Sequence, residues 1–127
     1  MSLVADPVIA LLRELVAIDS VNPTLVPGAR GETDIARRLA DELRSLGLTV
    51  EMADVAPDRP NVVGVLEGRH AGRSLMLCGH TDTVGVTGMP KPFTPDIRDG
   101  KLFGRGAQDM KGGVAAMVGV ARSIVES

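Results

Sequence analysis

Residues 74–84 read Ser-Leu-Met-Leu-Cys-Gly-His-Thr-Asp-Thr-Val and point to both a fold and a site. The four residues after Ser74 are all apolar, which is typical of a strand that helices cover on both faces. We therefore predict that residues 74–80 form a central strand of a sheet. His80 and Asp82 follow at its carboxyl end, where open α/β sheets gather their ligand sites, and their spacing places both on one side of an extended chain. Alone, such a pair is weak evidence for a site.

The segments around this strand add helices and further strands. Asp6 and Pro7 begin a helix, because the aspartate can cap it and proline suits the first helical position. Asp99 and Gly100 lie between short extended runs, which predicts a hairpin turn. By apolar periodicity, the other expected elements are helices over 32–46 and 110–125 and strands over 48–53 and 61–66. This order of elements predicts an α/β sandwich in a single domain.

Composition excludes several classes of protein. The 127 residues carry 14 Lys and Arg among 16 Asp and Glu, with no basic stripe and only two aromatic residues, so we expect no nucleic-acid partner. No uncharged apolar run approaches the ~20 residues that cross a bilayer, so we expect no membrane partner. The beginning of the chain does not read as a signal peptide. One cysteine, Cys78, excludes an intramolecular disulfide and fits a reducing compartment, so we predict a cytoplasmic protein.

A second informative segment, 102–113, reads Leu-Phe-Gly-Arg-Gly-Ala-Gln-Asp-Met-Lys-Gly-Gly and leads into the last expected helix. Its carboxylate, Asp109, could belong to a site or could simply cap that helix, and the residues alone leave both open. The glycines do not match nucleotide-binding motifs. The stretch from Gly104 to Asp109 lacks the third glycine of the dinucleotide motif, and the stretch from Gly106 to Lys111 lacks the ending of a phosphate loop.

Taken together, the two segments resemble the M20 family of metallopeptidases and amidohydrolases. Residues 79–84 match the family's first metal motif, and residues 99–113 match its second. The resemblance extends to the N-terminal helix and to the Ser-Val-Asn-Pro loop at 20–23, so it covers essentially the whole chain. It implies a zinc-exopeptidase-like α/β fold, a three-layer sandwich with a mainly parallel, mixed sheet.

The resemblance also implies roles for three residues. His80 would bind one metal ion, Asp109 would bridge two, and Asp82 would take part in catalysis by orienting His80. Imidazole and carboxylate ligands suit Zn²⁺, with Co²⁺ or Mn²⁺ as substitutes. The implied reaction is hydrolysis of an amide bond in an N-acyl amino acid or small peptide, by an enzyme that is a homodimer when complete. Nothing in the sequence identifies the substrate-binding residues.

Several parts of the M20 pattern are missing. Residues 1–127 correspond to the N-terminal part of the catalytic domain, whereas the general-base Glu, the remaining metal ligands and the dimerisation domain are absent. We therefore expect the chain alone to be inactive and to bind zinc weakly, because a zinc ion normally has at least three protein ligands. The alternative function is a non-catalytic binding or regulatory module that has kept the scaffold. The resemblance further predicts a cis peptide bond after Asp109 in the complete, metal-loaded enzyme.

Four other residues have open interpretations. Cys78 could join His80 as a metal ligand, although a lone Cys in an apolar strand usually packs in a core. His70 lies in a turn and is expected to be solvated. Arg105 could contact a substrate carboxylate or brace its loop. Lys111 stands at a helix start, where the helix dipole disfavours a cation, and this hints at a local partner.

Overall fold

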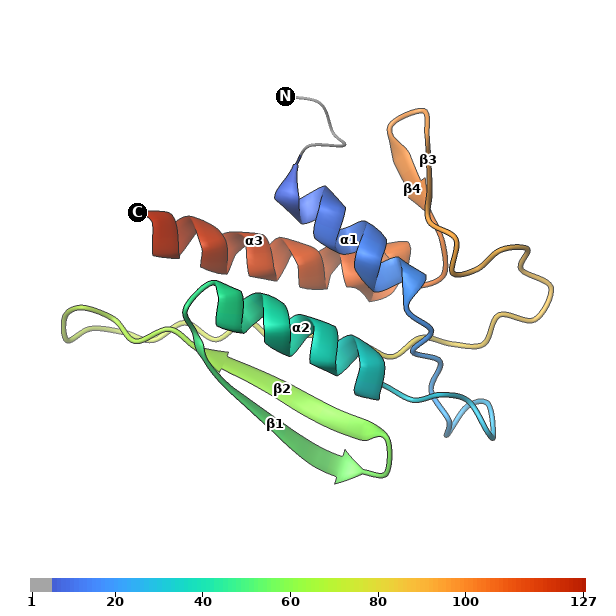
Figure 1. The fold of residues 1–127 in the computed structure, drawn as a ribbon, viewed down its shortest axis with the longest axis horizontal. Coiled ribbons are helices and arrows are strands. Elements are labelled where there is room, and N and C mark those ends of the chain that lie inside the picture. The colour runs from blue at the N-terminus through green and yellow to red at the C-terminus, as the bar shows by residue number, and fades with distance from the viewer. Residues whose placement is uncertain (1–5) are drawn as a thin grey trace.

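Residues 6–127 are described by a computed structural model, in which three helices combine with two antiparallel hairpins (Figure 1). In that view α2 lies between the β1–β2 hairpin and the pair formed by α1 and α3, while the β3–β4 hairpin projects from the opposite side. The elements are α1 Pro7–Ala17, α2 Thr33–Ser45, β1 Thr49–Ala56, β2 Arg59–Val65, β3 Asp96–Arg98, β4 Lys101–Phe103, a short turn η2 Ala107–Lys111, and α3 Gly112–Glu126. The mixture of helices and small sheets confirms the predicted α/β class.

Helix α1 begins as its sequence predicts. The Asp6 side chain accepts a hydrogen bond from the Val8 amide at 2.7 Å, and Pro7 occupies the first helical position. This cap satisfies one of the amide groups that a helix N-terminus leaves without a partner. Just after the C-terminal end of α2, Gly47 has φ +86°. Glycine adopts this left-handed conformation without steric cost, and it ends the helix.

The three helices share one hydrophobic core. Each contributes an apolar face, and burying a large aliphatic side chain stabilises a fold by roughly 1.5 to 3 kcal/mol. Helices α1 and α3 approach closely at Gly119, where an added Cβ would lie 2.6 Å from the Val8 side chain. The core residues are Leu11 and Leu15 from α1, Ile35 and Leu39 from α2, and Val114, Ala115 and Val118 from α3.

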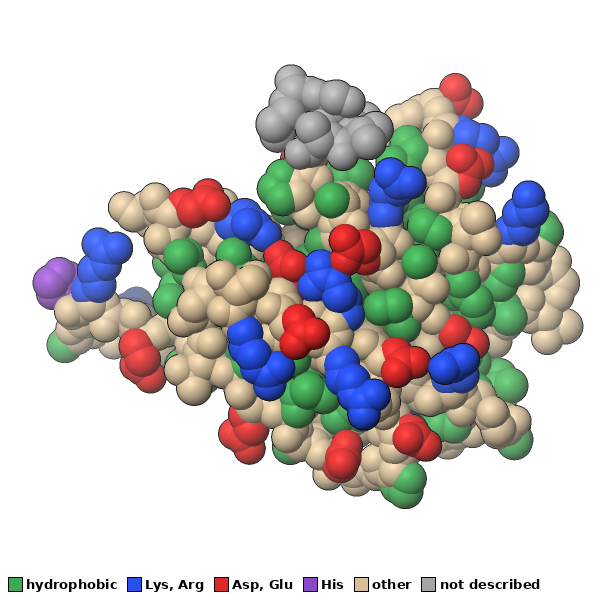
Figure 2. Space-filling view, viewed as in Figure 1, with side chains coloured by type: hydrophobic (Ala, Val, Ile, Leu, Met, Phe, Trp, Pro, Cys, Tyr) green, Lys and Arg blue, Asp and Glu red, His purple; other side chains and the backbone are tan. Residues whose placement is uncertain are grey.

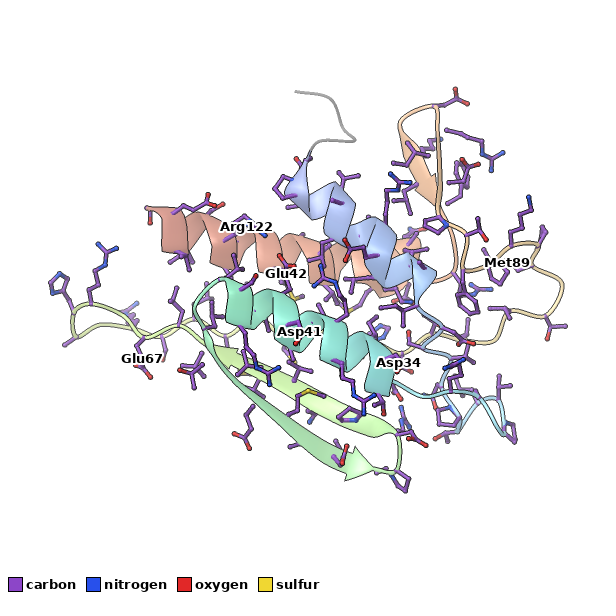
Figure 3. The ribbon with its side chains drawn as sticks, in the orientation of Figure 1. Asp34, Asp41, Glu42, Glu67, Met89 and Arg122 are labelled. Atoms are coloured by element: carbon purple, nitrogen blue, oxygen red, sulfur yellow. The ribbon has the colours of Figure 1, made fainter. Side chains whose placement is uncertain are left out.

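Ion pairs connect the helices on the outside of this core. Glu42 of α2 accepts hydrogen bonds from Arg38 on its own helix at 2.9 Å and from Arg122 of α3 at 2.6 Å. Figure 3 shows Arg122 and Glu42 reaching toward each other between their helices. Basic and acidic side chains are intermixed over the face drawn in Figure 2. Within residues 6–127, no helix is long and apolar enough to cross a membrane.

The strands predicted over 48–53 and 61–66 form, and so does the hairpin predicted around Asp99 and Gly100. Strands β1 and β2 pair antiparallel with Thr49 opposite Val65, close to the boundaries expected from the sequence. In the β3–β4 turn, Asp99 and Gly100 both have positive φ, as expected of an Asp-Gly hairpin turn. Both ladders are antiparallel, and the parallel contact among the described residues is a single bridge between Val21 and Thr83.

The prediction of a central strand over 74–80 is wrong for this chain. This segment has no ladder partner among residues 6–127, and Leu75 and Met76 remain 75% and 84% exposed. Its apolar pattern requires cover on both faces, and the described residues do not supply it. Toward its end the segment approaches Met110, since the Cβ position of Gly79 lies 2.8 Å from the Met110 side chain. Cys78 is exposed as well, so its expected role in core packing is also wrong.

Candidate metal centre

The His80 ring lies between two carboxylates that come from the two sequence motifs. Its Nδ1 is 3.1 Å from Oδ1 of Asp82, and its Nε2 is 3.1 Å from Oδ1 of Asp109. The three residues are separated along the chain by up to 29 positions, and they meet at the surface, with the His80 side chain 49% exposed. The structure thus brings together His80, Asp82 and Asp109, the three residues to which the family resemblance assigns roles.

The two carboxylates change the electrostatics of His80. Burial lowers the pKa of the imidazole, but the hydrogen bond with Asp109 and the hydrogen bond and charge of Asp82 outweigh burial and raise the pKa above its ordinary value. Each carboxylate addresses a different ring nitrogen, so Asp82 can accept a proton held on Nδ1 while Nε2 faces Asp109. Such an arrangement is typical of a metal-binding histidine, whose second nitrogen is held by a carboxylate.

Asp109 lies in a turn that departs from regular helix. The backbone of η2 is non-helical at Asp109 and Met110, and the peptide bond between these two residues is cis, the isomer that the family resemblance predicts for the complete enzyme. Helix α3 begins after this turn with Lys111 at its cap position, and no side-chain hydrogen bond caps α3 in the described part of the chain. Asp109 therefore does not act as a helix cap, and its carboxylate is paired with His80 instead.

Lys111 anchors this turn to helix α1. Its side chain is only 1% exposed, and its Nζ donates hydrogen bonds to the backbone oxygens of Leu15 at 2.8 Å and Ile18 at 2.7 Å. These oxygens belong to the C-terminus of α1, where carbonyl groups lack helical partners and a positive charge is favoured. Burial lowers the pKa of Lys111 to about 8, against the opposing charge of Asp19. The local partner expected from the sequence is therefore the end of α1.

A loop after α1 holds the His80 segment from the other side. The Ser20 hydroxyl donates to the Thr81 oxygen at 2.8 Å, and the Thr83 amide donates to the Ser20 oxygen at 3.0 Å. The Asn22 amide nitrogen Nδ2 donates to Oδ2 of Asp82 at 2.8 Å. Sequence reasoning missed this contact. The one feature of the sequence that pointed to Asn22 was the resemblance of the loop at 20–23 to the M20 family.

The three site residues line an open cavity of about 300 Å³. Gly106, with φ +80°, lets the Asp109 turn approach Thr83, because a Cβ there would lie 2.7 Å from the threonine methyl group. Two buried polar atoms in the cavity wall, Thr83 Oγ1 and Arg105 Nε, have no hydrogen-bond partner within residues 6–127. The residues that line the cavity are His80, Asp82, Thr83, Val84, Gly104, Arg105, Gly106, Ala107, Gln108 and Asp109.

The described residues do not form a complete set of metal ligands. No group of three or more His, Cys, Asp and Glu side chains within residues 6–127 lies close enough to hold an ion. His70 is exposed in its turn, as predicted, and neither His70 nor Cys78 lines the cavity around His80. The side chains with metal-binding chemistry that the structure brings together are His80, Asp82 and Asp109.

Comparisons with known proteins point to one family. Residues 76–127 match the model of peptidase family M20/M25/M40. The chain is 39% identical over 117 residues to the N-formyl-4-amino-5-aminomethyl-2-methylpyrimidine deformylase of Halalkalibacterium halodurans, an alignment that covers 87% of the chain and 26% of the deformylase. It also resembles the crystal structure of human carnosine dipeptidase 1, with a TM-score of 0.79 and 30% identity.

The structural likeness covers almost the whole chain but only part of its relatives. The match to carnosine dipeptidase 1 includes 98% of this chain and 29% of the dipeptidase. The chain therefore spans between a quarter and a third of the length of the proteins it matches. Because the likeness extends over both helices and hairpins, it confirms the predicted α/β fold.

Proposed function

Since the chain belongs to peptidase family M20/M25/M40, we propose that the protein containing it is a metal-dependent hydrolase of amide bonds. His80 and Asp109 are its proposed metal ligands, and Asp82 is the residue that orients His80. One observation carries this proposal: Nε2 of His80 and Oδ1 of Asp109 converge to 3.1 Å from two distant motifs while Asp82 holds Nδ1.

The donor atoms suit divalent zinc. Imidazole nitrogen and carboxylate oxygen are both ordinary zinc ligands, at roughly 2.0 to 2.2 Å, so atoms 3.1 Å apart can contact one ion together. The Asp109 side chain is 87% exposed, which leaves its second oxygen accessible for another ion. Co²⁺ and Mn²⁺ share enough of this ligand preference to substitute. The residues present therefore fit part of a two-metal site.

The residues of this chain would have complementary tasks around such ions. A metal pair supplies Lewis-acid polarisation of the amide carbonyl and activation of water. Asp82 accepts the Nδ1 proton of His80 and so would leave the lone pair of Nε2 available to bind a metal ion. Arg105 faces the same cavity and is the cation of this chain best placed to meet a substrate carboxylate, the first of its two interpretations.

The names of the relatives support an amide as the bond that is cut. One is a deformylase of an N-formyl compound and the other a dipeptidase. We propose an N-acyl amino acid or small peptide as the substrate class. The remaining metal ligands, the general-base Glu and the dimerisation domain would come from outside these 127 residues. Because the chain brings together two ligands and zinc normally needs at least three, we expect no turnover from the chain alone.

Metal removal tests this function. The intact protein that contains the chain is assayed on N-formyl and N-acetyl amino acids and on dipeptides, before and after treatment with a chelator. We expect hydrolysis that is lost on chelation and returns with Zn²⁺, Co²⁺ or Mn²⁺, and none from the 127-residue chain under the same conditions. Hydrolysis that persists in protein shown to be free of metal, or failure to cut any of these amides, would contradict the proposal.

A further inference from the structure

We infer that Asn22 is a positioning residue, which fixes the Asp82 carboxylate and through it the orientation and tautomer of the His80 ring. The hydrogen bonds form a chain: Asn22 Nδ2 donates to Oδ2 of Asp82 at 2.8 Å, and Oδ1 of Asp82 lies 3.1 Å from Nδ1 of His80. Each carboxylate oxygen thus has its own partner. The consequence for metal affinity rests on the proposed function, whereas the effect on the imidazole does not.

The orientation of the Asn22 amide follows from its second contact. Its Oδ1 accepts a hydrogen bond from the Thr24 backbone amide at 2.8 Å. A backbone amide can only donate, so the oxygen of the side chain must face Thr24 and the NH₂ group must face Asp82. The donor is therefore presented to the carboxylate by the local fold of the loop.

The backbone holds Asn22 and Asp82 in register with each other. The backbone N–H of Asn22 donates to the backbone oxygen of Thr83 at 2.9 Å. The backbone oxygen of Thr81 accepts from the Ser20 hydroxyl at 2.8 Å. Both neighbours of Asp82 are thus bonded to residues 20–22. These backbone bonds do not fix the rotation of the Asp82 side chain, and the hydrogen bond from Asn22 restrains that rotation.

Restraining Asp82 matters because the two His80 nitrogens have different tasks. In a neutral imidazole one nitrogen donates and the other accepts, and a carboxylate at Nδ1 favours the tautomer protonated there. Nε2 would then offer its lone pair to a metal ion, whereas without a metal the Asp109 carboxylate competes with Asp82 for the ring proton. A carboxylate that rotates away would leave Nδ1 with the neutral Asp82 backbone oxygen, 3.2 Å away, as its remaining Asp82 acceptor, and the preference for the Nδ1-protonated tautomer would weaken. Substituting a residue that hydrogen-bonds to a metal ligand typically lowers metal affinity by roughly 10- to 100-fold.

A simpler reading is that Asn22 only shapes the turn, because asparagine side chains often accept from the amide two residues ahead. The substitution Asn22→Asp separates the two roles. Aspartate keeps the oxygen that accepts from Thr24, but it replaces the donor toward Asp82 with a second negative charge. Asn22→Ser is the second variant, since serine supports such a turn and is too short to bridge to Asp82. Asn61→Asp, at an exposed position of β2, is the matched control for added charge.

The test measures the His80 ring directly by ¹⁵N NMR of the chain, at a pH above the raised pKa of His80 so that the ring is neutral. The chain has only two histidines, so His70 serves as an internal reference. Relative to the wild type and Asn61→Asp, we expect Asn22→Asp and Asn22→Ser to shift the ring toward the Nε2-protonated form, because Asp109 still accepts from Nε2 while Asp82 is less well held. Unchanged His80 signals in both Asn22 variants would overturn the inference.

Metal affinity of the intact protein provides a second readout. If the proposed function holds, Zn²⁺ affinity falls by roughly 10- to 100-fold in the Asn22 variants and stays constant in Asn61→Asp. Wild-type protein that binds no metal would count against the proposed function alone, because the NMR result would still decide the role of Asn22. Wild-type zinc affinity in both Asn22 variants would overturn the link between this residue and the metal.

Discussion

Replacing Asp109 with asparagine should nearly abolish amide hydrolysis by the intact protein. The substitution keeps the shape of the side chain but removes the charge that would bridge two cations. Its effect on kcat/KM should exceed the roughly 10- to 100-fold losses that are typical of residues one step removed from a metal. Steady-state kinetics at saturating Zn²⁺ measure this effect.

The same variant should fold normally. The Asp109 side chain is 87% exposed and its hydrogen bond is with His80, so the free energy of unfolding should change by less than about 0.5 kcal/mol. Asp99→Asn, in the β3–β4 turn, makes the same chemical change away from the cavity and should keep full activity. An Asp109→Asn protein that retains kcat/KM within tenfold of the wild type would show that Asp109 is not a metal ligand.

Replacing Lys111 with methionine should destabilise the chain by about 2 to 3 kcal/mol, because buried hydrogen bonds from a charged group are strong and their loss leaves an acceptor unpaired. Methionine fills similar space but cannot donate to the oxygens of Leu15 and Ile18. The Leu15 oxygen keeps a weak bond from the Ile18 amide at 3.3 Å, so the Ile18 oxygen bears most of the loss. Urea unfolding followed by circular dichroism measures the change.

Lys101→Met provides the matched control for Lys111. Lys101 is exposed in β4, so its substitution should change stability by no more than about 0.5 kcal/mol. In the intact protein, only the Lys111 variant should also lose activity, because Lys111 ties the turn that carries Asp109 to helix α1. Equal free energies of unfolding for the two variants would mean that the hydrogen bonds of the Lys111 amine to the end of α1 do not stabilise the chain.

Local signals in the sequence predicted much of this structure. The cap at Asp6 and the Asp-Gly turn at 99–100 depend on neighbouring residues, and both form as expected. The meeting of His80 with Asp82 was predictable from their spacing of two. The approach of Asp109 was predictable only because the two motifs together resemble a known family.

Longer-range features could not be predicted in this way. The apolar run after Ser74 specifies a strand only where other strands and helices flank it, and residues 6–127 leave Leu75 and Met76 exposed. The partner of Lys111 lies up to 96 positions away, and the partner of Asn22 lies 60 positions away. Such contacts depend on how the loop after α1 packs beside the His80 segment, and no local pattern encodes that packing.

The position of a bound metal ion decides whether His80 and Asp109 are ligands. The intact protein is crystallised with Zn²⁺, and anomalous diffraction at the zinc edge locates the ions without assuming their ligands. We expect zinc within roughly 2.0 to 2.2 Å of His80 Nε2 and of an Asp109 carboxylate oxygen, with Asp82 on Nδ1 and not on the metal. Zinc bound by Cys78, or zinc absent from the His80–Asp109 pair in an active crystal, would contradict it.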